Sequence, residues 1–163
     1  MRIVPHEGTY VVDLTAAELR QIHVLRDALE PIAVDDAALY LKTDDKRQLA
    51  DLKSVMRRAA DARDYRQYFE HDLLFHQTIW NLSGNPILHN VLKTVCQPFF
   101  TYQIVNCRPS DKDLEASVEV HDAIVRALQQ DKDRHLRATV HRCLRIEADL
   151  ASASTRDRTH RRR

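Results

Sequence analysis

The stretch FEHDLLFHQTIWNLSGNP, residues 69–86, decides the fold class of this chain. Its apolar residues recur at the three- and four-residue intervals of an amphipathic helix. Asp72 and His76 lie four residues apart, so both side chains leave one face of that helix and can bind the same ion. A carboxylate and an imidazole on an otherwise apolar face indicate either a metal site or a buried ion pair, and the spacing alone leaves both open.

The end of this stretch separates two helices. Ser83-Gly84 ends the first helix, Asn85 is a preferred N-cap residue, and Pro86 suits the first position of the next helix. The junction therefore predicts two consecutive helices joined by a tight turn.

The composition indicates one helical domain. The chain has 163 residues, enough to bury about two-thirds of its unfolded surface in a single core. Only 2 residues are glycine and only 6% are aromatic, as is typical of helical bundles. So few glycines exclude a Gly-rich phosphate loop and a dinucleotide-binding fingerprint.

Apolar periodicity predicts an all-α antiparallel bundle of about six to seven helices. The first helix begins at Thr15, whose side chain is expected to form a capping box with Glu18, and Pro31 is expected to kink it. Later helices are expected from the Asp64 cap to Ser83 and over residues 44–62, 86–105, 112–130 and 132–150.

The same periodicity predicts which side chains face the core. Leu25 and Ile32 fall in the inward stripe of the first helix, and Val91 falls in that of the helix over 86–105. Cys143 and Glu147 follow the inward pattern of the last helix.

Charge is unevenly distributed along the chain. The formal net charge is +1, but residues 156–163 hold five arginines against one aspartate, so the remainder is mildly acidic. A mildly acidic bundle is not a general nucleic-acid binder. We expect residues 151–163 to form a disordered basic tail.

The cysteines and the apolar segments indicate the compartment. Cys96, Cys107 and Cys143 are odd in number and lack CxxC spacing, so no disulfide framework is expected. The sequence shows no signal peptide and no apolar run of membrane-spanning length. We therefore expect a cytoplasmic protein without membrane contact.

Residues 1–14 differ from everything that follows. A glycine turn and the run Thr9-Tyr10-Val11-Val12 are typical of a short strand. One strand is not stable alone, so it must pair with a segment outside this chain or lie along the bundle.

A third candidate ligand is His121, on the apolar face of the helix expected over 112–130. Alone it fits a core histidine that is satisfied by a hydrogen bond. Together with Asp72 and His76, it adds a third metal-type ligand from a different helix.

These segments resemble a known family. Asp72-Leu73-Leu74-Phe75-His76, the Ser83-Gly84-Asn85 junction and the segment Ser117–Ile124 are similar to the FCD domain, the C-terminal effector-binding domain of FadR-type regulators in the GntR superfamily. One departure is Val120, which replaces the Glu that usually precedes the histidine. Residues 1–14 resemble the last wing strand of the winged-helix DNA-binding domain that precedes FCD domains.

The resemblance implies a metal site. In this family one Asp and three His hold a divalent metal at the bundle centre, which implies Asp72, His76 and His121 as three ligands. The fourth position falls on Cys143, which shares the apolar face of its helix, and His141 is the alternative. A thiolate favours Zn²⁺, with Ni²⁺ as a further option, whereas a thiol that only fills space leaves a weaker three-ligand site.

The resemblance also implies an effector, because many family members bind a small carboxylate against the metal. Arg26 is the candidate for binding it, since a guanidinium can bind a carboxylate through two hydrogen bonds. A helix-surface pair between Arg26 and Glu30 is the alternative. Asn85 is a second candidate, although its capping role is enough to explain it.

On this resemblance we expect a ligand-sensing and dimerisation domain over residues 15–150 and no enzyme activity. DNA would be contacted only through a winged-helix domain that lies outside this chain. The alternatives are a structural dimerisation scaffold with a degenerate metal site and a mononuclear metalloenzyme. Neither Glu-x-x-His nor His-Glu-x-x-His occurs in the sequence, which argues against di-iron and zinc-protease chemistry.

Overall fold

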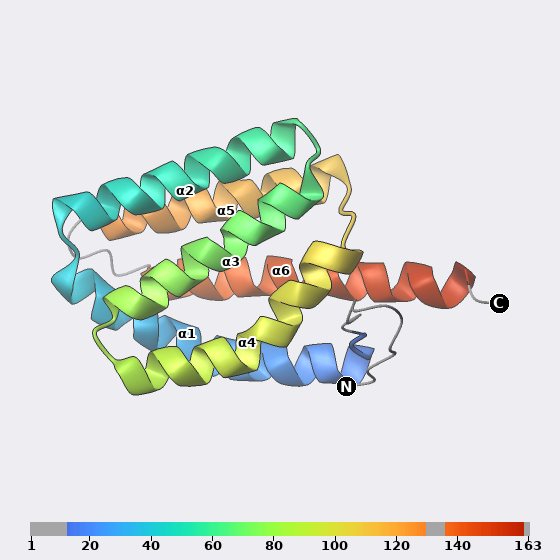
Figure 1. The fold of residues 1–163 in the computed structure, drawn as a ribbon, viewed down its shortest axis with the longest axis horizontal. Helices are drawn as coiled ribbons and strands as arrows, with labels where there is room; N and C mark the ends of the chain where they lie inside the picture. Colours follow the sequence, from blue (N-terminus) through green and yellow to red (C-terminus); the bar gives the residue numbers. More distant parts are fainter. Residues whose placement is uncertain (1–12, 130–135, 162–163) are drawn as a thin grey trace, which may run out of the picture.

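The computed structural model describes residues 13–129 and 136–161, with side chains as far as Ser152. Over these residues the backbone forms six α-helices and no strand, which confirms the predicted all-α bundle (Figure 1). The predicted wing strand falls largely within residues 1–12, outside the described part of the chain. The helices are α1 (Ala16–Tyr40), α2 (Thr43–Asp61), α3 (Tyr65–Leu82), α4 (Pro86–Asn106), α5 (Asp111–Gln129) and α6 (Leu136–Arg161).

Side-chain caps explain where three helices begin. Thr15 and Glu18 form the predicted capping box of α1, in which the Glu18 amide donates to Thr15 Oγ1 over 3.2 Å and the Thr15 amide donates to the Glu18 carboxylate over 2.8 Å. Asp64 and Asn85 cap α3 and α4, each accepting a bond of 3.0 Å from the amide three residues later.

The turn between α3 and α4 depends on Gly84. Its φ is +68°, in the left-handed region that side-chain-bearing residues rarely adopt. Ser83 supports the turn, because its hydroxyl donates to the Trp80 carbonyl over 2.7 Å and accepts from the Asn85 amide over 3.2 Å. The predicted junction is therefore a tight turn, and α4 packs back against α3.

The helices pack as a layered bundle. In Figure 1, α2 and α5 lie side by side at one edge, α1 and α4 lie at the other, and α3 and α6 run between them. α6 packs against α1 and α5, while α3 packs against α1, α2 and α4. Side chains from α1, α3, α5 and α6 therefore meet in the middle of the bundle.

Three apolar residues lie on the surface, where the periodicity predicts them to face the core. Leu25 is 46% exposed, and Ile32 and Val91 are each 42% exposed, so those predictions are wrong. The physical reason is that α1 and α4 carry apolar residues on two faces, and a repeat spacing cannot tell which face packs within the chain.

The ends of two helices also bear on the predictions. α1 continues through Pro31 as one helix. α6 continues to Arg161, where a disordered tail is expected from residue 151 onward, and Ala151 is fully buried. Residues 136–161 contain neither glycine nor proline, so nothing local ends the helix earlier.

No helix in the described residues has the length and apolarity needed to cross a lipid bilayer.

Candidate metal centre

Six ionisable side chains and one thiol meet at the centre of the bundle. They come from four helices, and none is more than 3% exposed. An apolar core surrounds them, so each charge must be satisfied by its neighbours or by a bound ion. The residues are Arg26 and Glu30 on α1, Asp72 and His76 on α3, His121 on α5, and Cys143 and Glu147 on α6.

Four of these side chains can bind a single ion. One ligand atom from each of His76, His121, Cys143 and Glu147 lies within 4.8 Å of the other three. Cys143 Sγ is 3.1 Å from Glu147 Oε1 and 3.7 Å from His121 Nε2, while His76 Nε2 is 2.9 Å from Glu147 Oε1. Asp72 adjoins this group, with Oδ1 2.9 Å from His121 Nε2 and 3.6 Å from His76 Nε2.

Hydrogen bonds fix the orientation of both imidazoles. Nδ1–H of His121 donates to the Ser117 carbonyl over 2.7 Å, and Nδ1–H of His76 donates to Glu30 Oε2 over 2.7 Å. Trp80 Nε1–H also donates to Glu30 Oε2, over 3.3 Å. Both rings therefore direct Nε2 toward the same point, which is the arrangement that outer partners give to metal-binding histidines.

Arg26 lies fully buried beside the ligand group. Its Nε is 2.5 Å from Glu30 Oε1, and its Nη1 is 2.7 Å from Glu147 Oε2. The guanidinium carbon lies 4.6 Å and 4.8 Å from the ring centroids of Phe99 and Phe100. Two carboxylates and two aromatic faces thus compensate the loss of water around this cation.

Burial and nearby charges shift the pKa values of the ligands. Burial lowers the pKa of His76, but the neighbouring carboxylates, first that of Glu147, raise it to about 10. Burial also lowers the pKa of His121, and the Asp72 carboxylate raises it above its ordinary value. Burial, followed by the nearby carboxylates, raises the pKa of the Cys143 thiol well above its ordinary value. Binding a cation at these atoms therefore has to release protons.

The donor set fits a divalent transition metal. Imidazole nitrogen, thiolate sulfur and carboxylate oxygen are the donors that zinc takes in proteins. Asp72 is 0% exposed; its Oδ1 is paired with His121 Nε2 at 2.9 Å, while its Oδ2 makes no hydrogen bond. A buried carboxylate oxygen without a donor is costly, and a bound cation would satisfy it.

The structure brings most of the predicted site residues together. Asp72, His76, His121, Cys143 and Arg26 all lie in the central cluster. His141, the alternative fourth ligand, is instead 40% exposed, with Nδ1 2.7 Å from Asp27 Oδ1. Asn85 is exposed at the N-terminus of α4, where it serves as the cap. Neither His141 nor Asn85 contacts the cluster through a bond found in the described residues.

Sequence reasoning missed the roles of Glu30 and Glu147. The sequence indicated Glu30 only as a possible surface partner of Arg26. Its bond to His76 joins residues 46 apart in sequence, so no local spacing predicts it. Glu147 did follow the inward pattern, four residues after Cys143. That spacing matches Asp72 and His76 and is the signal that could have identified it.

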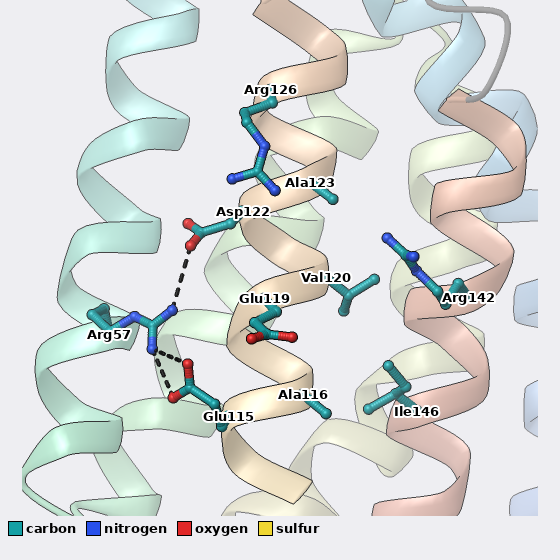
Figure 2. A pocket seen from close by; sticks show the side chains of 10 residues that line it. All are labelled: Arg57, Glu115, Ala116, Glu119, Val120, Asp122, Ala123, Arg126, Arg142 and Ile146. Carbon is teal, nitrogen blue, oxygen red and sulfur yellow. Dashed lines mark hydrogen bonds and ion pairs between the residues drawn. The ribbon is translucent and has the colours of Figure 1, made fainter. Parts of the chain in front are cut away.

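A surface groove of about 500 Å³ lies between α2, α5 and α6 (Figure 2). Arg57 spans it, with Nη1 2.7 Å from both oxygens of Glu115 and Nη2 3.4 Å from Asp122. Three arginines and three carboxylates line the groove, so it offers no excess charge to a phosphate or a metal. These charged residues are Arg57, Arg126, Arg142, Glu115, Glu119 and Asp122.

Helical bundles commonly build metal and ligand sites from side chains on facing helices, as in this cluster. The FCD domain family matches residues 21–146. The chain therefore belongs to the FCD domain family, the effector-binding regulatory domain of GntR-type transcription regulators. It is a regulatory domain of transcription regulators and not an enzyme.

Solved structures share the fold. The chain is similar to E. coli McbR/YncC, with a TM-score of 0.75 and 20% identity, over 96% of this chain and 76% of that chain. It is also similar to a structure described as "Lar controls the expression of the Listeria monocytogenes agr system and mediates virulence", with a TM-score of 0.73 and 18% identity, over 91% of this chain and 72% of that chain. No curated protein matched the sequence.

Proposed function

We propose that this FCD domain binds a divalent metal at its centre and senses a small carboxylate effector there. The observation that carries the proposal is the convergence of four ligand atoms within 4.8 Å, beside a buried guanidinium. A buried ionic network adds little stability by itself, so this concentration of charged groups in an apolar core favours a binding role.

The proposed metal ligands are Asp72, His76, His121 and Cys143. The last three belong to the convergent group, and Asp72 takes the place of Glu147 in it, because Asp72 Oδ1 lies 2.9 Å from His121 Nε2 and 3.6 Å from His76 Nε2. Zn²⁺ is the preferred ion and Ni²⁺ the second choice, because a thiolate ligand disfavours harder cations. The metal would supply a positive centre that polarises a bound carboxylate, while the imidazoles stay oriented by their Nδ1 bonds.

Arg26 is the proposed anchor of the effector carboxylate. The Glu147 carboxylate bridges this guanidinium to the metal ligands, because it contacts both Arg26 and His76. A small acid bound beside Arg26 would direct one oxygen toward the metal and another toward the guanidinium. Asn85 is the weaker candidate, because its side chain is already engaged in capping α4.

We further propose that the domain forms a homodimer through the outer faces of α1 and α4. Large apolar residues are exposed along both helices, which pack side by side (Figure 1). On α1 the exposed Leu25, Ile32 and Leu39 recur every seven residues, and on α4 Ile87 and Val91 lie four residues apart, as in helices that pack against another helix. The exposed residues are Val24, Leu25, Ile32, Leu39, Ile87, Val91 and Val105.

α1 connects the two proposed sites, because Arg26 faces the centre and Leu25 and Ile32 face outward. An effector that shifts α1 would change how two protomers meet, and so the spacing of the DNA-binding domains attached to them. Contact with DNA would come from a winged-helix domain outside this chain, and work at DNA would place the regulator in the cytoplasm.

Replacing Arg26 with lysine tests the effector site. Arg26→Lys keeps the charge and loses the planar fork, so it should weaken binding of small carboxylates by about tenfold or more. Calorimetric titration of the Zn²⁺-loaded protein with mono-, di- and tricarboxylates measures this, and Arg142→Lys in the surface groove is the control. Equal affinities for wild type and Arg26→Lys would remove Arg26 from the site.

A further inference from the structure

Glu147 lies between Arg26 and the metal-type ligands. Its Oε2 is 2.7 Å from Arg26 Nη1, while its Oε1 is 2.9 Å from His76 Nε2 and 3.1 Å from Cys143 Sγ. The side chain is 0% exposed. One carboxylate of the chain itself thus bridges a guanidinium and the group that can hold a cation.

This is the position that a carboxylate effector would need. We propose that Glu147 is a built-in carboxylate that occupies the effector position, and that an effector acid binds by displacing it from Arg26. The inference rests on the proposed function, because it specifies what the empty sensor holds at the same site.

Glu147 is easier to displace than the other carboxylate beside Arg26. Glu30 is held by three donors, which are Arg26 Nε at 2.5 Å, His76 Nδ1 at 2.7 Å and Trp80 Nε1 at 3.3 Å. Glu147 is held by Arg26 at Oε2, and at Oε1 by His76 Nε2 at 2.9 Å and Cys143 Sγ at 3.1 Å. Those last two are metal-type ligand atoms that a bound cation would take from Glu147, whereas the donors to Glu30 would stay in place. A competing carboxylate would therefore replace Glu147.

Arg26 has a donor available for the incoming acid. Its Nη2 is buried and makes no hydrogen bond. A buried guanidinium N–H without an acceptor is costly, and a ligand that supplies two oxygens would satisfy more of this cation than Glu147 does.

A surface pocket of about 260 Å³ adjoins this position. Phe99 and Ala148 contribute to its lining, together with Leu19 and His23. The Phe99 ring also lies against the Arg26 guanidinium, 4.6 Å from centroid to carbon. Phe99 thus borders both the pocket and Arg26, and the mostly apolar lining of the pocket suits the carbon chain of a small acid.

Displacement of Glu147 would break a link between helices. The Arg26–Glu147 ion pair joins α1 to α6, which pack against each other. An acid that takes over Arg26 releases α6 from α1, which gives the proposed sensor two distinct packing states.

Truncation of Glu147 tests the inference. Glu147→Ala removes a CH₂–COO⁻ group, which free acetate can restore, so acetate is the probe. Acetate should raise the melting temperature of Glu147→Ala in a saturable manner at constant ionic strength, and should bind it at least tenfold more tightly than it binds wild type. Glu119→Ala, which removes an exposed carboxylate of the α5 groove, should behave as wild type. Equal acetate affinity for Glu147→Ala and wild type would overturn the inference.

A second variant covers the case in which Glu147→Ala does not fold. Glu147→Gln keeps the volume and weakens the hold on Arg26, so it should still bind acetate several-fold more tightly than wild type. Recovery of helical circular dichroism by Glu147→Ala in acetate, but not in chloride, would also support the inference. If acetate restores nothing and Glu147→Gln matches wild type, the inference fails.

Metal-free and Zn²⁺-loaded samples separate this inference from the proposed function. The acetate gain at Arg26 does not need the metal and should appear in both samples. Absence of metal binding with a preserved acetate gain would contradict the metal site and leave the Glu147 inference intact. Metal binding without tighter acetate binding by Glu147→Ala would contradict the Glu147 inference and leave the metal site intact.

Discussion

At the scale of single residues, the centre of the bundle balances three carboxylates against three basic groups. Glu147 illustrates the balance, since burial raises its pKa but Arg26 and then His76 lower it well below its ordinary value. Removing one member would leave an unpaired buried charge, at a cost of about 3–5 kcal/mol. The six groups are Glu30, Asp72, Glu147, Arg26, His76 and His121.

Cys143 is the residue that sets the proposed choice of metal. In the Co²⁺-substituted protein, Cys143→Ser should abolish the thiolate-to-metal charge-transfer absorption and weaken metal binding by about tenfold or more. Absorption spectroscopy during a Co²⁺ titration measures both effects. His141→Ala is the matched control and should leave the spectrum unchanged. If Cys143→Ser has no effect while His141→Ala alters the spectrum, the fourth ligand is His141.

The sequence predicted the central residues that follow helix periodicity but not all of their partners. Asp72 and His76 were recognisable because their spacing placed both on one face of one helix. The partnership of Glu30 with His76 was not recognisable, because it joins α1 to α3 and depends on how the helices pack. Local spacing predicts which face a residue occupies, and packing decides what it meets there.

At the scale of helices and turns, the caps were the most predictable features. Thr15, Asp64 and Asn85 each accept the bond from the amide three residues later that their positions in the sequence predict. The faces of α1 and α4 were less predictable, since apolar residues lie both inward and outward. Only the packed structure distinguishes a face that meets the core from a face left for another partner.

The role of Asn85 can be decided at this scale. Asn85→Ala should lower the free energy of unfolding by about 1 kcal/mol, because the Leu88 amide loses its acceptor. Carboxylate binding should not change, since Asn85 is exposed and already engaged as the cap. Urea unfolding and calorimetric titration measure the two quantities. A loss of affinity larger than the loss of stability would assign Asn85 to the effector site.

At the scale of the whole molecule, the apolar faces of α1 and α4 predict the assembly. Val91→Glu should convert the proposed dimer to a monomer, because it places a charge on the outward apolar face of α4. Sedimentation velocity measures the change. Leu74→Glu is the matched control, since Leu74 is 46% exposed on α3, away from that face. The same dissociation in both variants, or in neither, would contradict an α1–α4 interface.

The metal content of the purified protein is the most direct test of the centre. Elemental analysis of wild type should find about one equivalent of Zn²⁺, or of Ni²⁺, per chain. Asp72→Ala should lose it, whereas Asp27→Ala, which removes the partner of His141, should keep it. No bound metal in wild type, and none after reconstitution with Zn²⁺ or Ni²⁺, would contradict a metal-based sensor. The cluster would then be a buried ionic network that only holds the helices together.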